Sequence, residues 1–188
     1  MSKIILIVCG DPNSINSEII FKVWKKLNSR LKEKIFFIGN YELIKSQFKK
    51  LKYNTNLLKL QKISNKSNKF KIIDIPLNFK KPFNVSKKEA SRYVLKSLDK
   101  AHALTLNQMV KGLINCPIDK KLLSESKEIG VTEYLASKCR IKNNSEVMMI
   151  YNKKFSVVPI TTHLKIRNVA NKIKKQTIIK KIETLNKE

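Results

Sequence analysis

Two apolar runs that each end in glycine and lead into a helical pattern constrain this fold more than any other feature. The runs "KIILIVCG" (3–10) and "KIFFIG" (34–39) are rich in β-branched and aromatic residues, which is typical of buried strands. Residues 17–31 then place apolar side chains at helical spacing, and "NYELIKSQFKKL" does the same after the second run. Strands that alternate with helices predict a parallel sheet with helices on its faces.

Four polar residues stand where helices are expected to begin, and each is predicted to be an N-cap. Ser86 is the most specific of them, because Glu89 follows it in the S-x-x-E spacing of a capping box. Glu18 in a first turn adds a favourable charge near a helix N-terminus. The four are Ser17, Ser86, Asp119 and Thr132.

The remaining segments give weaker patterns. Residues 53–86 hold two short apolar stretches around "SNKSNK", which predict either a hairpin or an excursion from the sheet. Residues 111–120 predict a strand that Pro117 ends. Two apolar strands, 146–151 and 155–160, surround the polar turn "NKK" and predict a β-hairpin. Apolar positions beyond residue 163 predict a further helix.

The net charge of +26, from 40 Lys+Arg against 14 Asp+Glu, would ordinarily indicate a nucleic-acid or anionic membrane partner. The kind and placement of the bases argue against that interpretation. Arginine, which favours bidentate phosphate and base recognition, occurs only four times, and the lysines are spread along the chain without interleaved aromatics. We therefore expect mainly a solvated lysine surface, and a genuine polyanion or phosphate preference stays open as the alternative.

Two features of the sequence indicate in which cellular compartment the protein is found. They are its three cysteines and the absence of long apolar runs. No stretch reaches the length of a membrane-spanning helix, and no small-residue cleavage site follows the first apolar run. Cys9, Cys116 and Cys139 have spacings that suit neither a disulfide framework nor a CxxC metal site. We expect reduced, semi-buried thiols in a soluble cytoplasmic protein without a membrane partner.

Four loops follow predicted strand ends or open helices, at the edge of the sheet where ligands of α/β proteins collect. They contain hydroxyls, amides or charged groups, and two lead into helix N-termini that would suit a phosphate. Ordinary capped loops explain the same pattern equally well. The loops are residues 10–18, 115–120, 130–136 and 161–167.

The same four loops carry a resemblance to a known family. "GDPNSINSEI" resembles the opening G-[ED]-P-[AS]-G-[IV]-G-P-E motif of the 4-hydroxythreonine-4-phosphate dehydrogenases, and "IGNYELIKS" resembles their second strand and helix. "GLINCPIDKKLL", "GVTEYLASK" and "VVPITTHLKIRNVANKI" are similar to the later motifs A-L-V-T-G-P-I-N-K, G-H-T-E-[FY]-L-A and V-T-T-H-[LIV]-P-L-[RK]-D-V. The motifs are colinear over about residues 4–174, so the order is more specific than any single match.

The resemblance implies an α/β/α sandwich with a mostly parallel sheet, in a two-lobed fold like that of isocitrate and isopropylmalate dehydrogenases. We expect residues 1–120 to form the first lobe and 121–188 to begin the second. Family members are usually homodimers with the active site near the interface. In pyridoxal 5'-phosphate biosynthesis they use NAD to oxidise the hydroxyl of a phosphorylated hydroxythreonine, which then loses carbon dioxide.

The family's site residues fall on two positions of this chain. The T-T-H histidine, one of three that bind a divalent metal (zinc, magnesium or cobalt), is His163, and the substrate-binding threonine of G-H-T-E is Thr132. Such a metal lowers the pKa of the alcohol and polarises the developing carbonyl. His102 and the cysteines match no family ligand, and we expect a structural or surface role for His102.

Several residues depart from the family pattern. Val131 stands where the substrate-binding histidine is found and can neither donate nor accept a hydrogen bond. Ser14 and Asn16 replace two glycines of the opening motif, so that loop now carries side chains. In the T-G-P-I-N-K motif, Cys116 replaces the glycine and Asp119 the asparagine. After T-T-H, Lys165 replaces the proline and Asn168 the aspartate.

The family pattern also continues beyond residue 188, where the other metal histidines and the lysine, asparagine and arginine that hold the substrate phosphate are expected. One histidine cannot make a catalytic zinc site, which takes about three protein ligands. Three interpretations therefore stay open. The chain is a divergent enzyme completed by a separately encoded C-terminal half, a non-catalytic truncated remnant, or a basic protein that binds an anionic metabolite or nucleic acid.

Overall fold

A computed structural model describes residues 4–63, 67–126, 130–139, 146–162 and 164–186 of the chain. Contacts divide the chain into two compact units, Met1–Leu135 and Ala136–Glu188. The predicted lobes, 1–120 and 121–188, stay a prediction.

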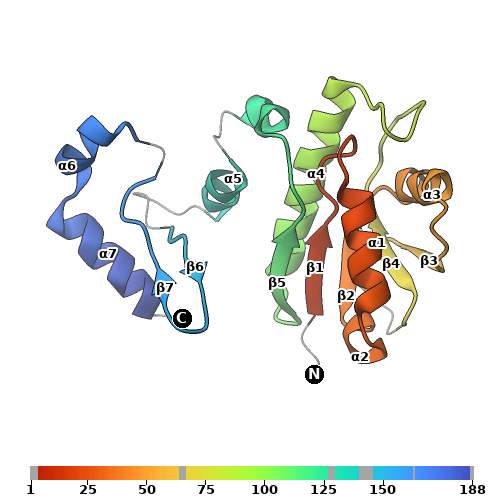
Figure 1. Cartoon of the computed structure of the whole chain (residues 1–188), viewed down its shortest axis with the longest axis horizontal. Coiled ribbons are helices and arrows are strands. Elements are labelled where there is room, and N and C mark those ends of the chain that lie inside the picture. The colour runs from red at the N-terminus through yellow and green to blue at the C-terminus, as the bar shows by residue number, and fades with distance from the viewer. Residues whose placement is uncertain (1–3, 64–66, 127–129, 140–145, 163, 187–188) are drawn as a thin grey trace. The chain divides into compact units, whose positions relative to one another are not determined.

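Unit 1 is built on a five-stranded sheet with the strand order β3-β4-β2-β1-β5 (Figure 1). Every neighbouring pair in this sheet runs parallel. The alternation of strands and helices therefore predicted the sheet correctly. The strands are β1 (Ile4–Val8), β2 (Ile35–Gly39), β3 (Leu57–Leu60), β4 (Phe70–Asp74) and β5 (Val110–Asn115).

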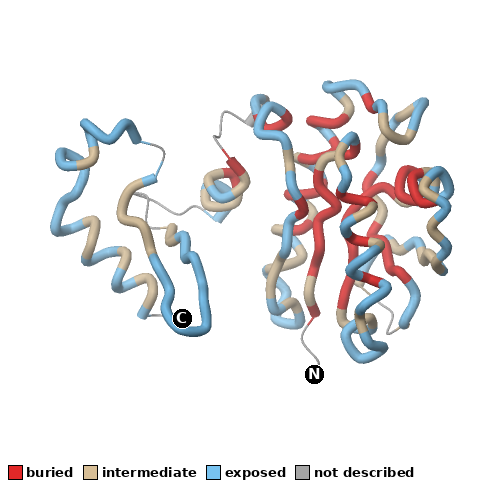
Figure 2. The backbone as a smooth tube through the Cα atoms, in the orientation of Figure 1, coloured by how far each residue is buried: buried red, intermediate tan, exposed pale blue. Residues whose placement is uncertain are grey.

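Helices pack on both faces of this sheet, as the expected α/β/α sandwich requires. Successive side chains of a strand point to opposite faces, and the central strands are apolar at nearly every position, so each face acquires its own core (Figure 2). The helices of unit 1 are α1 (Asn16–Lys26), α2 (Ser29–Lys32), α3 (Tyr41–Lys50), α4 (Lys87–Thr105), the 3-10 helix η1 (Lys120–Ser126) and α5 (Val131–Lys138).

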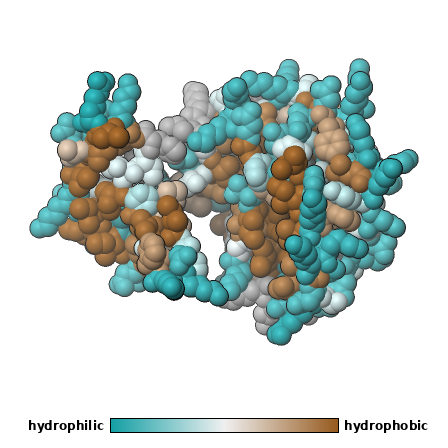
Figure 3. Space-filling model, viewed as in Figure 1, coloured by the Kyte–Doolittle hydropathy of each residue, from teal (hydrophilic) through white to brown (hydrophobic). Residues whose placement is uncertain are grey.

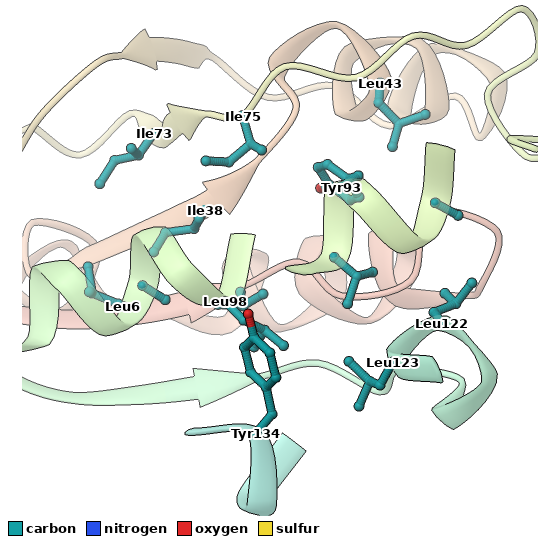
Figure 4. Close-up of a cluster of buried hydrophobic side chains, with 14 of the residues drawn as sticks. Leu6, Ile38, Leu43, Ile73, Ile75, Tyr93, Leu98, Leu122, Leu123 and Tyr134 are labelled. Carbon is teal, nitrogen blue, oxygen red and sulfur yellow. The ribbon is translucent and has the colours of Figure 1, made fainter. Parts of the chain in front are cut away.

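The core on the α4 face joins strand side chains to α4, η1 and α5. Figure 4 shows Tyr93 and Leu98 of α4 among isoleucines and leucines of the strands, with Leu123 of η1 beside them. The Ser91 hydroxyl donates a hydrogen bond to the Leu122 carbonyl at 2.7 Å and fixes η1 on α4. The Tyr134 hydroxyl donates to an Asp99 carboxylate oxygen at 2.6 Å and does the same for the start of α5.

The core on the other face is aromatic and lies under α1 and α3. Phe37 and Phe70 stack with ring centroids 3.8 Å apart, and Trp24 meets both rings edge-on. Such pairs add about 0.5–1.5 kcal/mol each beyond the area that they bury. Trp24 is only 3% exposed, so the C-terminal half of α1 is firmly seated on the sheet.

The capping predictions had mixed outcomes. Ser86 is the N-cap of α4 and accepts a hydrogen bond from the Glu89 backbone N–H, as predicted. Ser17 is not the cap of α1, because the helix begins at Asn16 and Ser17 is buried inside its first turn. The Ser14 hydroxyl accepts a bond from the Asn16 backbone N–H instead.

Two further helix starts differ from the predicted caps in detail. Asp119 accepts a hydrogen bond from the Lys121 backbone N–H at 3.0 Å, but the element that it starts is the 3-10 helix η1. Thr132 was predicted to cap α5 and lies within it, because the helix already begins at Val131 and the Gly130 carbonyl accepts from the Tyr134 N–H.

Residues 53–86 do not form a hairpin. β3 and β4 pair parallel at the edge of the sheet, with Leu57 beside Phe70 and Leu60 beside Ile73. The hairpin alternative is therefore wrong, although the connection over residues 61–69 is shorter than the dozen or so residues that a parallel crossover usually takes.

Unit 2 contains a short hairpin and helices. β6 (Ile150–Tyr151) pairs antiparallel with β7 (Ser156–Val157), so the predicted hairpin is confirmed with shorter strands. The 3-10 helix η2 (Ile166–Asn168), α6 (Val169–Lys172) and α7 (Lys175–Asn186) follow, where a helix was expected. No described residue of unit 2 is buried, so these elements have no core of their own.

One edge and one face of unit 1 leave apolar side chains uncovered. β5 pairs only with β1 among the described strands, and its Ile114 is 53% exposed. Ile15, which precedes α1, and Ile19 and Val23 within it are also exposed, at successive turns. Figure 3 shows apolar side chains gathered on the face that carries α1 and β5. Among the described helices, none is long and apolar enough to span a membrane.

Candidate functional site at the carboxyl edge of the sheet

The carboxyl ends of the parallel strands bring several loops of unit 1 to one edge of the sheet. β1 ends before Cys9 and Gly10, β2 before Asn40, and β5 before Cys116. Ligands of open α/β sheets bind at this edge. The edge is therefore the candidate site, and its geometry follows from how the loops are held.

Gly10 allows the first loop to turn back against the end of β5. Its φ is +74°, a conformation that favours glycine. A Cβ at this position would also lie 2.6 Å from the Asn16 side-chain nitrogen and 2.7 Å from the Pro117 carbonyl oxygen. Only glycine can occupy this place without moving its neighbours.

Asn16 joins loop 10–18 to loop 115–120. Its side-chain amide donates to the Pro117 carbonyl at 2.8 Å and to the Cys9 carbonyl at 3.0 Å. The Asp11 backbone N–H also donates to Pro117, at 3.3 Å. Two of the four predicted site loops thus lie against each other, and Asn16, identified as a departure from the family glycine, is the residue that joins them.

Two more side-chain amides fix the same loop from the other side. Asn13 donates to the Val85 carbonyl at 2.9 Å and accepts from the Val85 N–H at 2.8 Å. Gln47 of α3 donates to the Pro12 and Pro82 carbonyls at 2.8 and 2.6 Å. The opening loop therefore has little freedom. No local pattern predicts these two roles, because the partners are distant along the chain.

The N-terminus of α3 reaches the edge beside this loop. Asn40 caps the helix by accepting from the Leu43 N–H, and the Asp74 carboxylate accepts from the Tyr41 N–H at 2.7 Å. Lys59 makes an ion pair with Asp74 at 3.0 Å. These polar groups are satisfied by one another, so this helix end serves structure.

Cys9 and Cys116 occupy neighbouring strand ends in the aromatic core. Burial raises the pKa of the Cys9 thiol well above its ordinary value, and the neighbouring Cys116 raises it further. Burial also raises the pKa of Cys116 to about 11. Both groups are neutral thiols at physiological pH, which makes them poor nucleophiles and poor metal ligands as they stand.

Of the two predicted site residues, the structure describes only Thr132. It is exposed in the first turn of α5, beside Val131, which is half-buried. His163 lies outside the described residues. In unit 2 the neighbouring Thr161 and Thr162 line a cavity of about 450 Å³ together with three lysines, Lys172, Lys174 and Lys181.

The described residues do not form a metal site. Among them, no group of three histidine, cysteine, aspartate or glutamate side chains is placed to hold a metal ion. A tetrahedral catalytic site takes about three protein ligands. The donor set of the described residues alone therefore does not suit the metal of the resembled family.

Comparisons with known proteins agree with the fold and the motif order. The sequence model described as "Pyridoxal phosphate biosynthetic protein PdxA" matches residues 31–188. The 4-hydroxythreonine-4-phosphate dehydrogenase of Sulfurihydrogenibium sp. is 31% identical over 97% of this chain and 56% of its own length. That of Aquifex aeolicus is 29% identical over 100% of this chain and 58% of its own length.

Solved structures show the same fold. The 4-hydroxythreonine-4-phosphate dehydrogenase of Klebsiella pneumoniae superposes with a TM-score of 0.84 at 24% identity, over 99% of this chain and 59% of that protein. The enzyme of Burkholderia phymatum gives 0.83 at 19% identity, over 97% and 57%. The chain thus spans a little over half the length of the relatives that it matches. The chain belongs to the PdxA family of pyridoxal phosphate biosynthetic proteins.

Proposed function

We propose that this chain forms the first part of an NAD-dependent, divalent-metal-dependent dehydrogenase that oxidises and decarboxylates 4-phosphohydroxythreonine in pyridoxal 5'-phosphate biosynthesis. The observation that carries the proposal is the family match over residues 31–188, together with curated relatives that are named 4-hydroxythreonine-4-phosphate dehydrogenase. The fixed contact between loops 10–18 and 115–120 supports it, because both loops carry family motifs and meet at the edge where ligands bind.

The proposed substrate is anionic, and the residues that meet it come from the motif matches. Thr132, exposed at the start of α5, is proposed to bind the substrate through its hydroxyl. His163 is proposed as one of three histidine ligands of the metal. When bound, NAD accepts the hydride from the substrate carbon, and the metal acts as a Lewis acid on the alcohol.

Val131 is the main departure in this site. It follows Gly130 at the position where the family motif G-H-T-E has histidine. Its side chain can neither donate nor accept a hydrogen bond. Thr132 would therefore bind the substrate without a hydrogen-bonding side chain at position 131. We expect weaker substrate binding than in a chain with histidine at this position, and Val131→His should lower KM.

Activity is proposed to need more protein than this chain supplies. Because the chain covers 56% of the length of the Sulfurihydrogenibium relative, the remaining part of such a relative has no counterpart here. Unit 2 has no buried described residue, and β5 pairs only with β1 among the strands that the structure describes. The C-terminal half of such a protein, in a homodimeric assembly, would cover these surfaces and supply the other ligands. A non-catalytic remnant is the alternative.

A cytoplasmic location is part of the same proposal. It rests on the three cysteines, whose spacings along the chain suit no disulfide framework. Reduced thiols are typical of the cytosol, where disulfides are rare.

The test of the metal and substrate roles uses the chain supplied with the C-terminal segment of a relative. NADH formation from the phosphorylated substrate is measured with added zinc, magnesium or cobalt. His163→Ala should abolish NADH formation, and Thr132→Val should raise KM. The control is His102→Ala, at a histidine of α4 outside every family motif, which should leave both the rate and KM unchanged. Full activity in His163→Ala would refute the metal assignment.

A further inference from the structure

A cavity lies at the opposite edge of the sheet from the candidate site. Its volume is about 430 Å³, and its walls come from the end of α1, from α2 and from the segments that lead into β3 and β4. These elements meet at the amino ends of the strands, where α2 lies in Figure 1. No motif of the family falls on this part of unit 1, so the cavity is separate from the proposed dehydrogenase site.

The cavity is lined by positive charge and hydrogen-bond donors. Three lysines line it: Lys25 of α1, Lys32 of α2 and Lys69 just before β4. None of the residues that line the cavity is acidic. Three asparagines, Asn54, Asn56 and Asn68, line most of the remaining wall together with Thr55 and Ser67. Ammonium groups and neutral donors without a carboxylate are the chemistry that binds an oxyanion.

A buried lysine holds two walls of the cavity together. Lys71 has no exposed surface, and its ammonium donates to the Lys32 carbonyl at 3.0 Å and to the Ser67 carbonyl at 2.9 Å. It also donates to the Glu33 carbonyl at 2.7 Å and lies 4.3 Å from the centre of the Phe36 ring. A fourth positive charge thus stands behind the cavity and fixes the backbone of two residues that line it.

The buried ammonium of Lys71 donates to three backbone carbonyls, so its hydrogen bonds are satisfied within the chain. Burial lowers its pKa to about 8, although the Glu33 carboxylate opposes the shift. Because two of these carbonyls belong to Lys32 and Ser67, which line the cavity, an anion bound there would favour the ammonium form.

The chain's single tryptophan forms part of the same wall. Trp24 lines the cavity, is anchored below by Phe37 and Phe70, and has the Lys32 ammonium 5.3 Å from its ring centre. A ligand that draws the Lys32 ammonium toward itself would change the charge beside the indole. Because Trp24 is the only tryptophan of the chain, a change in tryptophan fluorescence reports on the surroundings of this one side chain.

We propose that this cavity, lined by Lys25, Lys32 and Lys69, is a binding site for a small phosphate-bearing anion, separate from the dehydrogenase site at the other edge of the sheet. The three lysines would bind the phosphate oxygens, and the asparagine amides would donate to the rest of the molecule. The volume exceeds that of a phosphate group, so the natural ligand is an organic phosphate or a polyphosphate.

The test titrates the whole chain with inorganic phosphate and with pyrophosphate, at constant ionic strength maintained with chloride. Binding is followed by calorimetry and by Trp24 fluorescence. The wild-type chain should show saturable binding with a fluorescence change. The variant Lys25→Gln/Lys32→Gln/Lys69→Gln should bind about tenfold more weakly, since each exposed ion pair contributes up to about 1 kcal/mol.

The matched control removes the same amount of charge elsewhere. Lys49, Lys96 and Lys111 are exposed and do not line the cavity. Their triple replacement by glutamine should leave phosphate affinity within about twofold. Should the first variant fold poorly, Lys25→Gln/Lys69→Gln spares the contact between Lys32 and Trp24 and should still weaken binding.

Three outcomes would overturn the proposal. The first is the absence of saturable binding of either anion to the wild-type chain. The second is an equal loss of affinity in the control variant, which would indicate general charge attraction. The third is binding of a single-stranded oligonucleotide without binding of phosphate or pyrophosphate, which would indicate a polyanion surface.

Discussion

The side-chain amide of Asn16 donates a hydrogen bond to the carbonyl oxygen of Pro117, 2.8 Å away and 101 residues along the chain. The same amide group binds the Cys9 carbonyl, so the ends of β1 and β5 are held by one buried side chain. The geometry of the candidate site depends on this residue, which stands where the opening motif of the family has a glycine.

Replacing Asn16 by alanine should therefore destabilise the chain. The loss of two buried hydrogen bonds leaves carbonyl groups without this donor, and we expect the free energy of unfolding in urea to fall by about 1–3 kcal/mol. Asn115→Ala is the control, because Asn115 is exposed and donates only one long bond, at 3.4 Å. Equal effects of the two substitutions would show that Asn16 does not hold the loops.

Gly39 should tolerate no larger side chain. A Cβ there would lie 2.9 Å from the Cys9 sulfur and 2.9 Å from the Tyr93 hydroxyl oxygen, both of which are buried. We expect Gly39→Ala to lower the unfolding free energy by about 1–3 kcal/mol through overpacking. At Gly112 an added Cβ meets nothing within 4 Å, so Gly112→Ala should change stability by less than about 0.5 kcal/mol. A Gly39→Ala chain as stable as Gly112→Ala would contradict the packing.

The buried Lys71 should give stability a specific dependence on pH. Burial lowers its pKa from the ordinary value of 10.5 to about 8 in the folded chain. Between these two values the unfolded chain binds more protons than the folded chain, so the contribution of Lys71 to stability rises with pH. Below pH 8 both states are protonated and the contribution is constant.

The measurement compares the wild type with Lys71→Met by urea unfolding from pH 7 upward. The difference in unfolding free energy should shift in favour of the wild type by up to about 2 kcal/mol between pH 8 and 10, since one pKa unit is about 1.4 kcal/mol. Lys69→Met, at an exposed position on the same segment, should show no such shift. A difference that moves against the wild type as pH rises would mean that the buried ammonium is favoured over the amine.

The three thiols should react at very different rates. Cys139 is exposed, whereas Cys9 and Cys116 are buried and burial raises the pKa of each. We expect a disulfide reagent to modify one thiol of the native chain quickly and all three in denaturant. Cys139→Ser should remove the fast phase. Rapid modification of three thiols under native conditions would show that the core around β1 and β5 is open.

The parts of the fold that could be predicted are those that depend on local sequence. The strands at Ile4–Val8 and Ile35–Gly39 follow from short apolar runs, and Ser86 caps α4 because its hydrogen-bond partner, Glu89, is three residues away. Ser17 was wrong as a cap because the start of α1 is set by the contact of Asn16 with Pro117, which no local pattern contains.

The same reason limits the prediction of the candidate site. Thr132 and His163 were identified through a family resemblance, and neither role is tested by the geometry. Asn13 and Gln47 were missed, because their partners at Val85, Pro12 and Pro82 become neighbours only in the folded sheet. The parallel pairing of β3 and β4 was missed for a different reason, since the short connection between them resembles that of a hairpin.

The central claim is that this chain is part of a dehydrogenase whose activity needs further protein. The most direct measurement is NADH formation from 4-phosphohydroxythreonine with added divalent metal, by the chain alone and by the chain mixed with the C-terminal segment of the Sulfurihydrogenibium relative. We predict no turnover by the chain alone and metal-dependent turnover by the mixture. Turnover by the chain alone, or none by a mixture that forms a stable folded complex, would contradict the claim.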